Sequence, residues 1–329
     1  MSGAGLFVVV NHTAARARGA WPRVREALTR AGVEFDAHES TRQGETEDRT
    51  RDALGRGFET VAAVGGDGTL SAAASGFFEP CAGLPEGSPP RAVNPSASLA
   101  VLPAGTGDDF ARGLSGGRRE PLEAWVARLV KHRRADAPRE ETTKRVDLLL
   151  GSVDGGACRF VCLNAATLGI GAEVAARVAA QGRAVRLLPG EARFALAALP
   201  RLAAWRARRV RVTVDGRVWQ ECGTNLLAVV NGTYAGGGMN LSPQASLTDG
   251  LLDVLAVCDI SRPALLRELS RVHTGGHLGN PHVKLTRATH VRIETLDPAE
   301  PLGVEADGDV RGHTPAEFRV MPAALNVVF

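Results

Sequence analysis

Apolar and polar positions alternate in two different ways along this chain. In the first 110 residues, continuous apolar runs at 6–10, 61–64 and 99–102 have the length of buried strands. Between them, segments 21–31 and 46–54 show helical spacing. Buried strands that alternate with helices predict a parallel sheet covered on both faces, which is an α/β domain.

A helix predicted over 123–134 and a polar linker over 135–144 separate this pattern from a different one. The later strand-like runs follow one another mostly without long helices, at 145–150, 159–164, 210–214, 225–230, 251–257 and 291–295. This spacing predicts a second domain that is largely an antiparallel β-sandwich. We place the α/β domain at 1–142, with 316–329 returning to it, and the β-rich domain at 143–315.

One helical segment interrupts the β-rich half, from about residue 172 to 209. It carries apolar residues and then Arg206, Arg208 and Arg209. The segment forms either two amphipathic helices that cover the β domain or a flap that contacts an anionic membrane surface.

Composition narrows the possible functions. The 39 basic and 36 acidic residues leave a net charge of +3, which gives no overall attraction to nucleic acid. We find no signal peptide and no apolar run of about 18 residues, so we expect a cytoplasmic protein without a spanning helix. The five scattered cysteines predict buried, reduced thiols, and the eight dispersed histidines show no metal-ligand spacing.

The most informative stretch is the strand at 61–64, which breaks into Gly65-Gly66-Asp67-Gly68-Thr69 before an alanine-rich helix. Glycines allow a ligand to approach the backbone, and a helix start favours anions, so this turn suits phosphate. A carboxylate there repels phosphate unless a metal bridges them, and Mg²⁺ is the natural bridge. The alternative is a tight turn with no ligand.

A second glycine turn follows the strand at 99–102, in the sequence Pro103-Ala104-Gly105-Thr106-Gly107-Asp108-Asp109-Phe110-Ala111-Arg112. Acidic residues at a helix start can serve simply as N-terminal caps. In such parallel sheets ligands bind at the carboxyl ends of the strands, where both Asn11 and Gly65 fall.

Together these turns resemble the GGDGT and PxGTxNDFAR motifs of diacylglycerol and sphingosine kinases, with Asp108 where the family has Asn. Two later blocks also resemble that family. The segment 231–254 contains a GGG turn and then Asp-Gly-Leu-Leu-Asp, and Asp307-Gly308-Asp309 looks like the family's DGE turn with Asp309 in place of Glu. NAD kinases share GGDGT, but the later blocks favour the lipid kinases.

The resemblance implies a role for each matching residue. It implies ATP contacts by Asn11, Thr13, Thr41, Gly65, Gly66, Asp67, Gly68, Thr69, Gly105 and Thr106. It implies catalytic Mg²⁺ linked through Asp67, Asp109 and Asp147, and a structural Mg²⁺ held by Asp249 with the carbonyls of Ser246 and Leu251. It implies that Asp309 or Asp307 is the general base, with Asp67 also catalytic.

One motif departs clearly from the family. The usual NPxSG turn is Asn11-His12-Thr13-Ala14-Ala15 here, so the glycine and serine are missing. The expected activity is ATP- and Mg²⁺-dependent phosphorylation of a hydroxyl of diacylglycerol or a related lipid. The expected partner is a lipid at the membrane surface, contacted peripherally, and exposed sheet edges allow a homodimer. The alternatives are an NAD kinase and a catalytically silent lipid-binding homologue.

Overall fold

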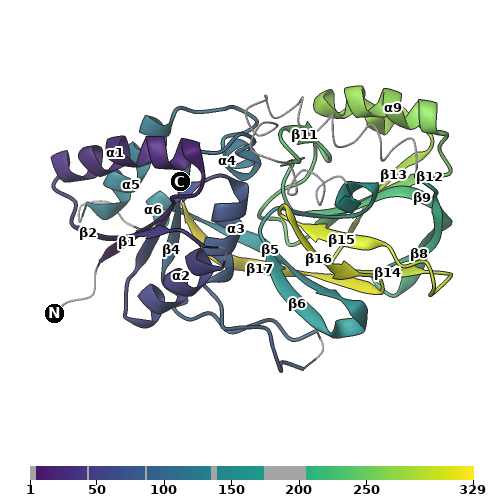
Figure 1. Cartoon of the computed structure of the whole chain (residues 1–329), viewed down its shortest axis with the longest axis horizontal. Helices are drawn as coiled ribbons and strands as arrows, with labels where there is room; N and C mark the ends of the chain where they lie inside the picture. Colours follow the sequence, from purple (N-terminus) through teal and green to yellow (C-terminus); the bar gives the residue numbers. More distant parts are fainter. Residues whose placement is uncertain (1–4, 43, 86, 135–138, 174–204) are drawn as a thin grey trace. The chain divides into compact units, whose positions relative to one another are not determined.

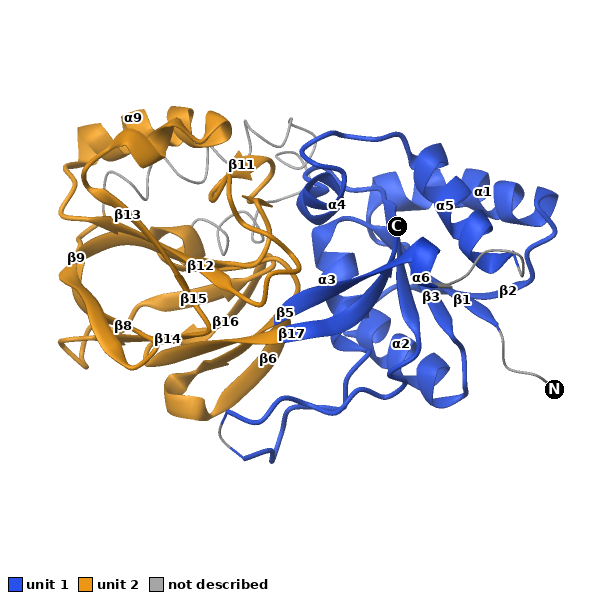
Figure 2. Cartoon of the chain, turned by 180° about the vertical axis from the view of Figure 1, so that it is seen from behind, with its two compact units in different colours: residues 1–148, 322–329 blue, residues 149–321 orange. Residues whose placement is uncertain are grey.

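The computed structural model describes residues 5–42, 44–85, 87–134, 139–173 and 205–329. The chain divides into two compact units, residues 1–148 with 322–329, and residues 149–321 (Figure 2). The cover or flap predicted over 172–209 falls largely on residues outside the described part of the chain.

Unit 1 is built on a parallel sheet in the order β17-β4-β3-β1-β2. Its strands are β1 (Leu6–Asn11), β2 (Phe35–Ser40), β3 (Thr60–Gly65), β4 (Ser98–Pro103) and the end of β17 (Ala316–Val328). Strands β1, β3 and β4 are almost wholly buried, as expected for parallel strands covered on both faces.

Helices cover both faces of this sheet (Figure 1). On one face, α1 (Ala15–Arg30) packs against α5 (Leu122–Arg133), while α2 (Glu45–Gly55) and α3 (Asp67–Ser75) pack together on the other. The short α4 (Asp109–Leu114) and α6 (Arg139–Thr142) complete the unit. The α/β prediction is confirmed.

Unit 2 is an antiparallel β-sandwich around one large apolar core. Its strands follow the order β16-β15-β7-β9-β8-β14-β17, β12 pairs with β9 and β13, and β5 pairs with β6. The strands are β5 (Thr143–Val153), β6 (Cys158–Cys162), β7 (Ala165–Gly169), β8 (Arg208–Val214), β9 (Arg217–Val230), β12 (Leu252–Cys258), β13 (Val283–Ala288), β14 (His290–Thr295), β15 (Gly303–Ala306) and β16 (Asp309–His313).

The smaller elements of unit 2 lie between these strands. They are the hairpin of β10 (Tyr234–Ala235) and β11 (Met239–Asn240), the helix α9 (Arg262–Arg271), and the 3₁₀ turns η1 (Asp154–Gly156), η3 (Val272–Thr274) and η4 (Gly276–Gly279). The prediction of a largely antiparallel β-sandwich is confirmed.

Three local predictions were wrong. Helix α1 begins at Ala15 rather than at residue 21, because Ala17 and Ala20 continue its buried face toward the N-terminus. Strand β2 was missed because it lies at the sheet edge and is mostly exposed, so its sequence is polar. The cysteines are not all reduced and buried either. Pairing of β9 with β12 brings Cys222 and Cys258 to a Cα–Cα distance of 5.7 Å, where they form a disulfide, and Cys158 is exposed.

Candidate functional site

The predicted nucleotide residues follow the carboxyl ends of adjacent parallel strands. The sheet register aligns Asn11 with Ser40, and Gly65 with Pro103. Since parallel strands end on one edge, the turns that follow β1, β2, β3 and β4 gather there. In open α/β sheets this edge is where ligands bind.

The two glycine turns touch through their backbones. A Cβ added to Gly66 would lie 3.1 Å from Gly105 Cα, and one added to Gly105 would lie 2.5 Å from Gly66 Cα. Gly65 is equally constrained, because its Cβ would lie 2.5 Å from the Cβ of Thr69. By contrast, a Cβ on Gly68 would meet only open space. Three of these glycines are therefore required by packing, while Gly68 leaves the backbone accessible.

A side chain at the turn after β1 forms a hydrogen bond with the glycine turn at residues 65–69. Asn11 Nδ2 donates to Thr69 Oγ1 at 3.1 Å, while Asn11 Oδ1 accepts from the Thr13 hydroxyl at 2.6 Å. The structure thus unites Asn11, Thr13 and Thr69 even though this turn departs from the NPxSG pattern. Thr106 is exposed in the second turn, and Thr41 follows β2, where its N–H donates to Glu45 at 2.8 Å.

Two acidic side chains bond to the backbone of the second glycine turn and of the helix that follows it. Asp67 Oδ1 accepts from the Phe110 N–H at 3.1 Å, at the start of α4. Asp108 has a left-handed backbone (φ 52°), and its Oδ1 accepts from the Gly105 N–H at 2.8 Å instead of capping α4. Burial and the nearby Asp67 raise the pKa of the Asp108 carboxyl to about 6. The two turns therefore concentrate negative charge that a cation would neutralise.

The acidic residues at these turns are better suited to bind Mg²⁺ that arrives with a nucleotide than to form a Mg²⁺ site from protein ligands alone. Among the described residues, no three His, Cys, Asp or Glu side chains are grouped as a metal site. Mg²⁺ that accompanies phosphates needs only one or two carboxylates, and Asp67 can supply one. Asp109, the first residue of α4, is 3% exposed, while Asp147 is buried on β5 and accepts from the Ala323 N–H at 2.7 Å. Their roles as Mg²⁺ ligands stay predictions.

The predicted structural Mg²⁺ site in unit 2 already has a cationic side chain. Arg287 Nη1 lies 3.5 Å from Asp249 Oδ2, and its Nε lies 3.2 Å from Asp253 Oδ1. The other Asp249 oxygen accepts from the Leu251 N–H at 3.2 Å. A metal held by Asp249, Ser246 and Leu251 would compete with this guanidinium, so we derive no chemistry through that site.

The Asp-Gly-Asp turn in unit 2 presents its two aspartates differently. The Asp307 carboxylate accepts from the N–H groups of Leu163, Asn164 and Ala165, at 2.6, 3.0 and 3.1 Å. The Asp309 side chain is 54% exposed and lies 3.5 Å from Arg311. Asp307 thus holds the end of β6 and the start of β7, and Asp309 is the more accessible of the two carboxylates.

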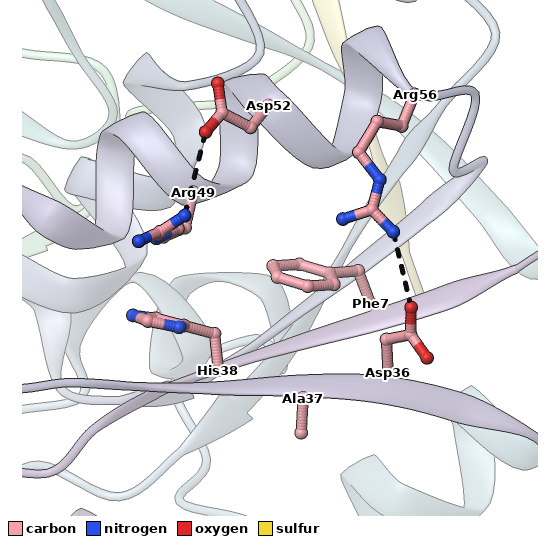
Figure 3. Close-up of a pocket in the computed structure, with 7 residues that line it drawn as sticks. All are labelled: Phe7, Asp36, Ala37, His38, Arg49, Asp52 and Arg56. Atoms are coloured by element: carbon pink, nitrogen blue, oxygen red, sulfur yellow. Dashed lines mark ion pairs between the residues drawn. The ribbon is translucent and has the colours of Figure 1, made fainter.

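The surface hollow in Figure 3 is a separate feature. It is lined by residues of β1, β2 and α2, namely Phe7, Asp36, Ala37, His38, Arg49, Asp52 and Arg56. Its charges pair internally, Arg56 with Asp36 at 3.5 Å and Arg49 with Asp52 at 4.0 Å. None of these lining residues belongs to the predicted site, and we assign the hollow no role.

Sequence reasoning missed two charged side chains at these turns. Arg16, in the first turn of α1, donates to the Gly105 carbonyl at 2.8 Å and adds positive charge beside the glycine loops. Glu305 is 8% exposed on β15, next to the Asp-Gly-Asp turn. A basic residue soon after the Asn11 turn was a usable signal for Arg16, whereas the burial of Glu305 appears only in the fold.

No helix in the described part of the chain is long and apolar enough to cross a membrane.

Comparisons with known proteins agree with this geometry. The diacylglycerol kinase catalytic domain model matches residues 5–138, and the model of the YegS C-terminal NAD kinase beta sandwich-like domain matches residues 167–329. A Bacillus subtilis protein named diacylglycerol kinase is 27% identical over 93% of this chain and 89% of its own length. A Pseudomonas aeruginosa protein named probable lipid kinase YegS-like is 32% identical over 92% of this chain and 86% of its own length.

Solved structures show the same fold. A diacylglycerol kinase from Bacillus anthracis superimposes with a TM-score of 0.66 at 18% identity, covering 100% of this chain and 98% of its own. An NAD kinase from Archaeoglobus fulgidus in complex with ATP gives a TM-score of 0.52 at 14% identity, covering 98% and 92%. The family models and the sequence relatives show that the chain belongs to the diacylglycerol kinase-like family of lipid kinases, as its motifs predicted.

Proposed function

We propose that this protein transfers the γ-phosphoryl group of ATP, with Mg²⁺, to a hydroxyl of diacylglycerol or a closely related lipid. The observation that carries the proposal is the backbone contact of two glycine turns at the carboxyl edge of a parallel sheet, beside Asn11, Thr69 and Asp67. Such an edge can bind phosphates through backbone N–H groups and helix starts.

On the donor side, each part of unit 1 has a definite task. The accessible backbone at Gly68 and the start of α3 bind phosphate oxygens, and Arg16 adds positive charge next to them. Asp67 would hold Mg²⁺, with Asp109 and Asp147 as further candidates. When bound, Mg²⁺ neutralises the charge that develops on the transferred group.

On the acceptor side, unit 2 supplies the base. Asp309 accepts the hydroxyl proton, while Asp307 keeps the turn in place through its three backbone bonds. The relatives named as lipid kinases favour a lipid hydroxyl as the acceptor, because they are similar to this chain in sequence. The NAD kinase, which would favour the ribose hydroxyl of NAD, is similar in fold alone.

Access to a lipid requires contact with a membrane surface, and the basic residues at 206–211 are one candidate for it. Their charge is partly offset, since Arg211 and Arg209 lie 3.0 and 3.8 Å from Glu221. Peripheral membrane contact and homodimer formation both stay predictions.

Replacing Asp67 tests the donor side of the proposal. Asp67→Asn keeps an oxygen that can accept from Phe110 but removes the charge that holds Mg²⁺, so we expect kcat for phosphorylation of diacylglycerol to fall on the order of 100-fold. The measurement is transfer of labelled γ-phosphate in mixed micelles. Asp52→Asn, an exposed charge removed in the same unit, is the control. Unchanged transfer by Asp67→Asn would show that the site is misassigned.

Two glycine substitutions separate packing from ligand contact. Gly65→Ala meets Thr69, so we expect its free energy of unfolding to fall by about 1–3 kcal/mol. Gly68→Ala fills only open space, so its stability should change by less than about 0.5 kcal/mol, while its Kd for ATP rises about tenfold because the methyl group blocks phosphate. Chemical denaturation measures the free energy of unfolding of each variant, and ATP titration measures its Kd for ATP. Wild-type ATP affinity in Gly68→Ala would contradict a phosphate at this backbone.

Asparagine substitutions in the Asp307-Gly308-Asp309 turn, here called the acid turn, distinguish the two aspartates. We expect Asp309→Asn to lower kcat by about 100-fold or more with little change in the KM for ATP, because a base is lost. Asp307→Asn should instead lower the free energy of unfolding by about 1–3 kcal/mol, because the amide replaces a charged acceptor of three N–H groups. Steady-state kinetics give kcat and chemical denaturation gives the free energy of unfolding for each variant. Glu300→Gln, at an exposed position, is the control. The reverse pattern would make Asp307 the base.

A further inference from the structure

Glu305 is a buried carboxyl group that the phosphoryl-transfer scheme does not yet use. It lies on β15 directly opposite Thr167 of β7 and is 8% exposed. Its Oε2 accepts from the Thr167 hydroxyl at 2.6 Å, and its Oε1 accepts from the Gly308 N–H. A buried carboxyl whose two oxygens are bound to different elements is fixed in position.

The bond to Gly308 spans the turn that carries both aspartates. Ala306 pairs with Asp309, so Asp307 and Gly308 form the two-residue connection between β15 and β16. Both have left-handed backbones, with φ values of 50° and 94°, as hairpins of this length favour. Glu305 fixes one residue of this connection, while the Asp307 carboxylate ties the other to β6 and β7. Asp309 follows immediately, with its side chain exposed.

The surroundings of Glu305 oppose its negative charge. Burial is the largest cause that raises its pKa, and the charges of Asp307 and Asp309 raise it further. The Thr167 hydroxyl and the Gly308 N–H lower it, and the result is a pKa of about 7. The titratable Cys162 thiol of β6 also faces this group, and burial holds its own pKa well above the usual value. Glu305 therefore changes charge near neutral pH.

We propose that Glu305 is a positioning residue of the acid turn. Its carboxylate accepts from Gly308 and Thr167 and so orients the hairpin that presents Asp309 to the acceptor hydroxyl. That Asp309 meets an acceptor hydroxyl rests on the proposed function. Protonation leaves Glu305 with a hydroxyl in place of one acceptor oxygen, which weakens its hold on the turn. Phosphoryl transfer should then decline as the pH falls through the pKa of this group.

The direct test uses the full-length protein without substrate. Because the Gly308 amide donates to Glu305, its NMR shift should titrate with a midpoint of about 7. Thr167→Val removes a bond that favours the charged form, so the midpoint should move to higher pH, and Thr167→Ser should restore it. Glu305→Gln should abolish the titration, and the exposed Glu300→Gln should leave it unchanged. A wild-type shift that is flat between pH 5 and 9, or one that still titrates in Glu305→Gln, would overturn the proposal.

Kinetics test the link to Asp309. In Glu305→Gln we expect kcat at pH 8 to fall about tenfold, with an unchanged KM for ATP and no acidic limb from this group. In Thr167→Val the acidic limb of wild-type activity should move to higher pH. If both variants keep the wild-type limb and kcat, Glu305 does not position the base. If no lipid is phosphorylated by the wild-type protein, the proposed function fails, while the Gly308 titration still decides whether Glu305 controls the turn.

Discussion

The close approach of two backbones at the carboxyl edge of the parallel sheet is the constraint on which the nucleotide side depends. At positions 66 and 105 the opposite backbone lies so close that a Cβ would crowd it. The register of β3 with β4 brings these turns together, and the Asp67 bond to Phe110 connects the helices that follow them. Because the two turns pack against each other and are joined by this bond, the backbone groups that we propose to bind phosphate are positioned by the fold itself.

The acid turn of unit 2 is likewise held in place by hydrogen bonds from the surrounding backbone. Three carboxyl groups lie within five residues, and each has a different environment. Asp307 is satisfied by backbone N–H groups, Asp309 is exposed, and Glu305 is buried. Groups of one chemical type can take different roles when their environments separate their proton affinities. Holding the turn and accepting a proton can therefore fall to different residues of the same hairpin.

Much of this arrangement could be predicted because its signals are local. Buried parallel strands have continuous apolar sequences, and the turns that follow them combine glycines and aspartates within a few residues. The α/β domain and the residues around Gly65 and Gly105 could therefore be recognised from the sequence. The features that were missed depend on contacts between distant segments. Strand β2 is polar because it lies at an edge, Cys222 meets Cys258 only through strand pairing, and Arg287 reaches the turn at Asp249 from β13. No local pattern distinguishes Glu305 from an exposed glutamate.

Whether this protein is a lipid kinase is decided by transfer of labelled γ-phosphate from ATP, in the presence of Mg²⁺, to a panel of acceptors in mixed micelles. The panel contains diacylglycerol, monoacylglycerol, ceramide, a sphingoid base and NAD. We expect a labelled lipid, with diacylglycerol or a closely related lipid as the acceptor, and no label in NAD. Label in NAD alone, or in none of the acceptors while ATP still binds, would contradict it.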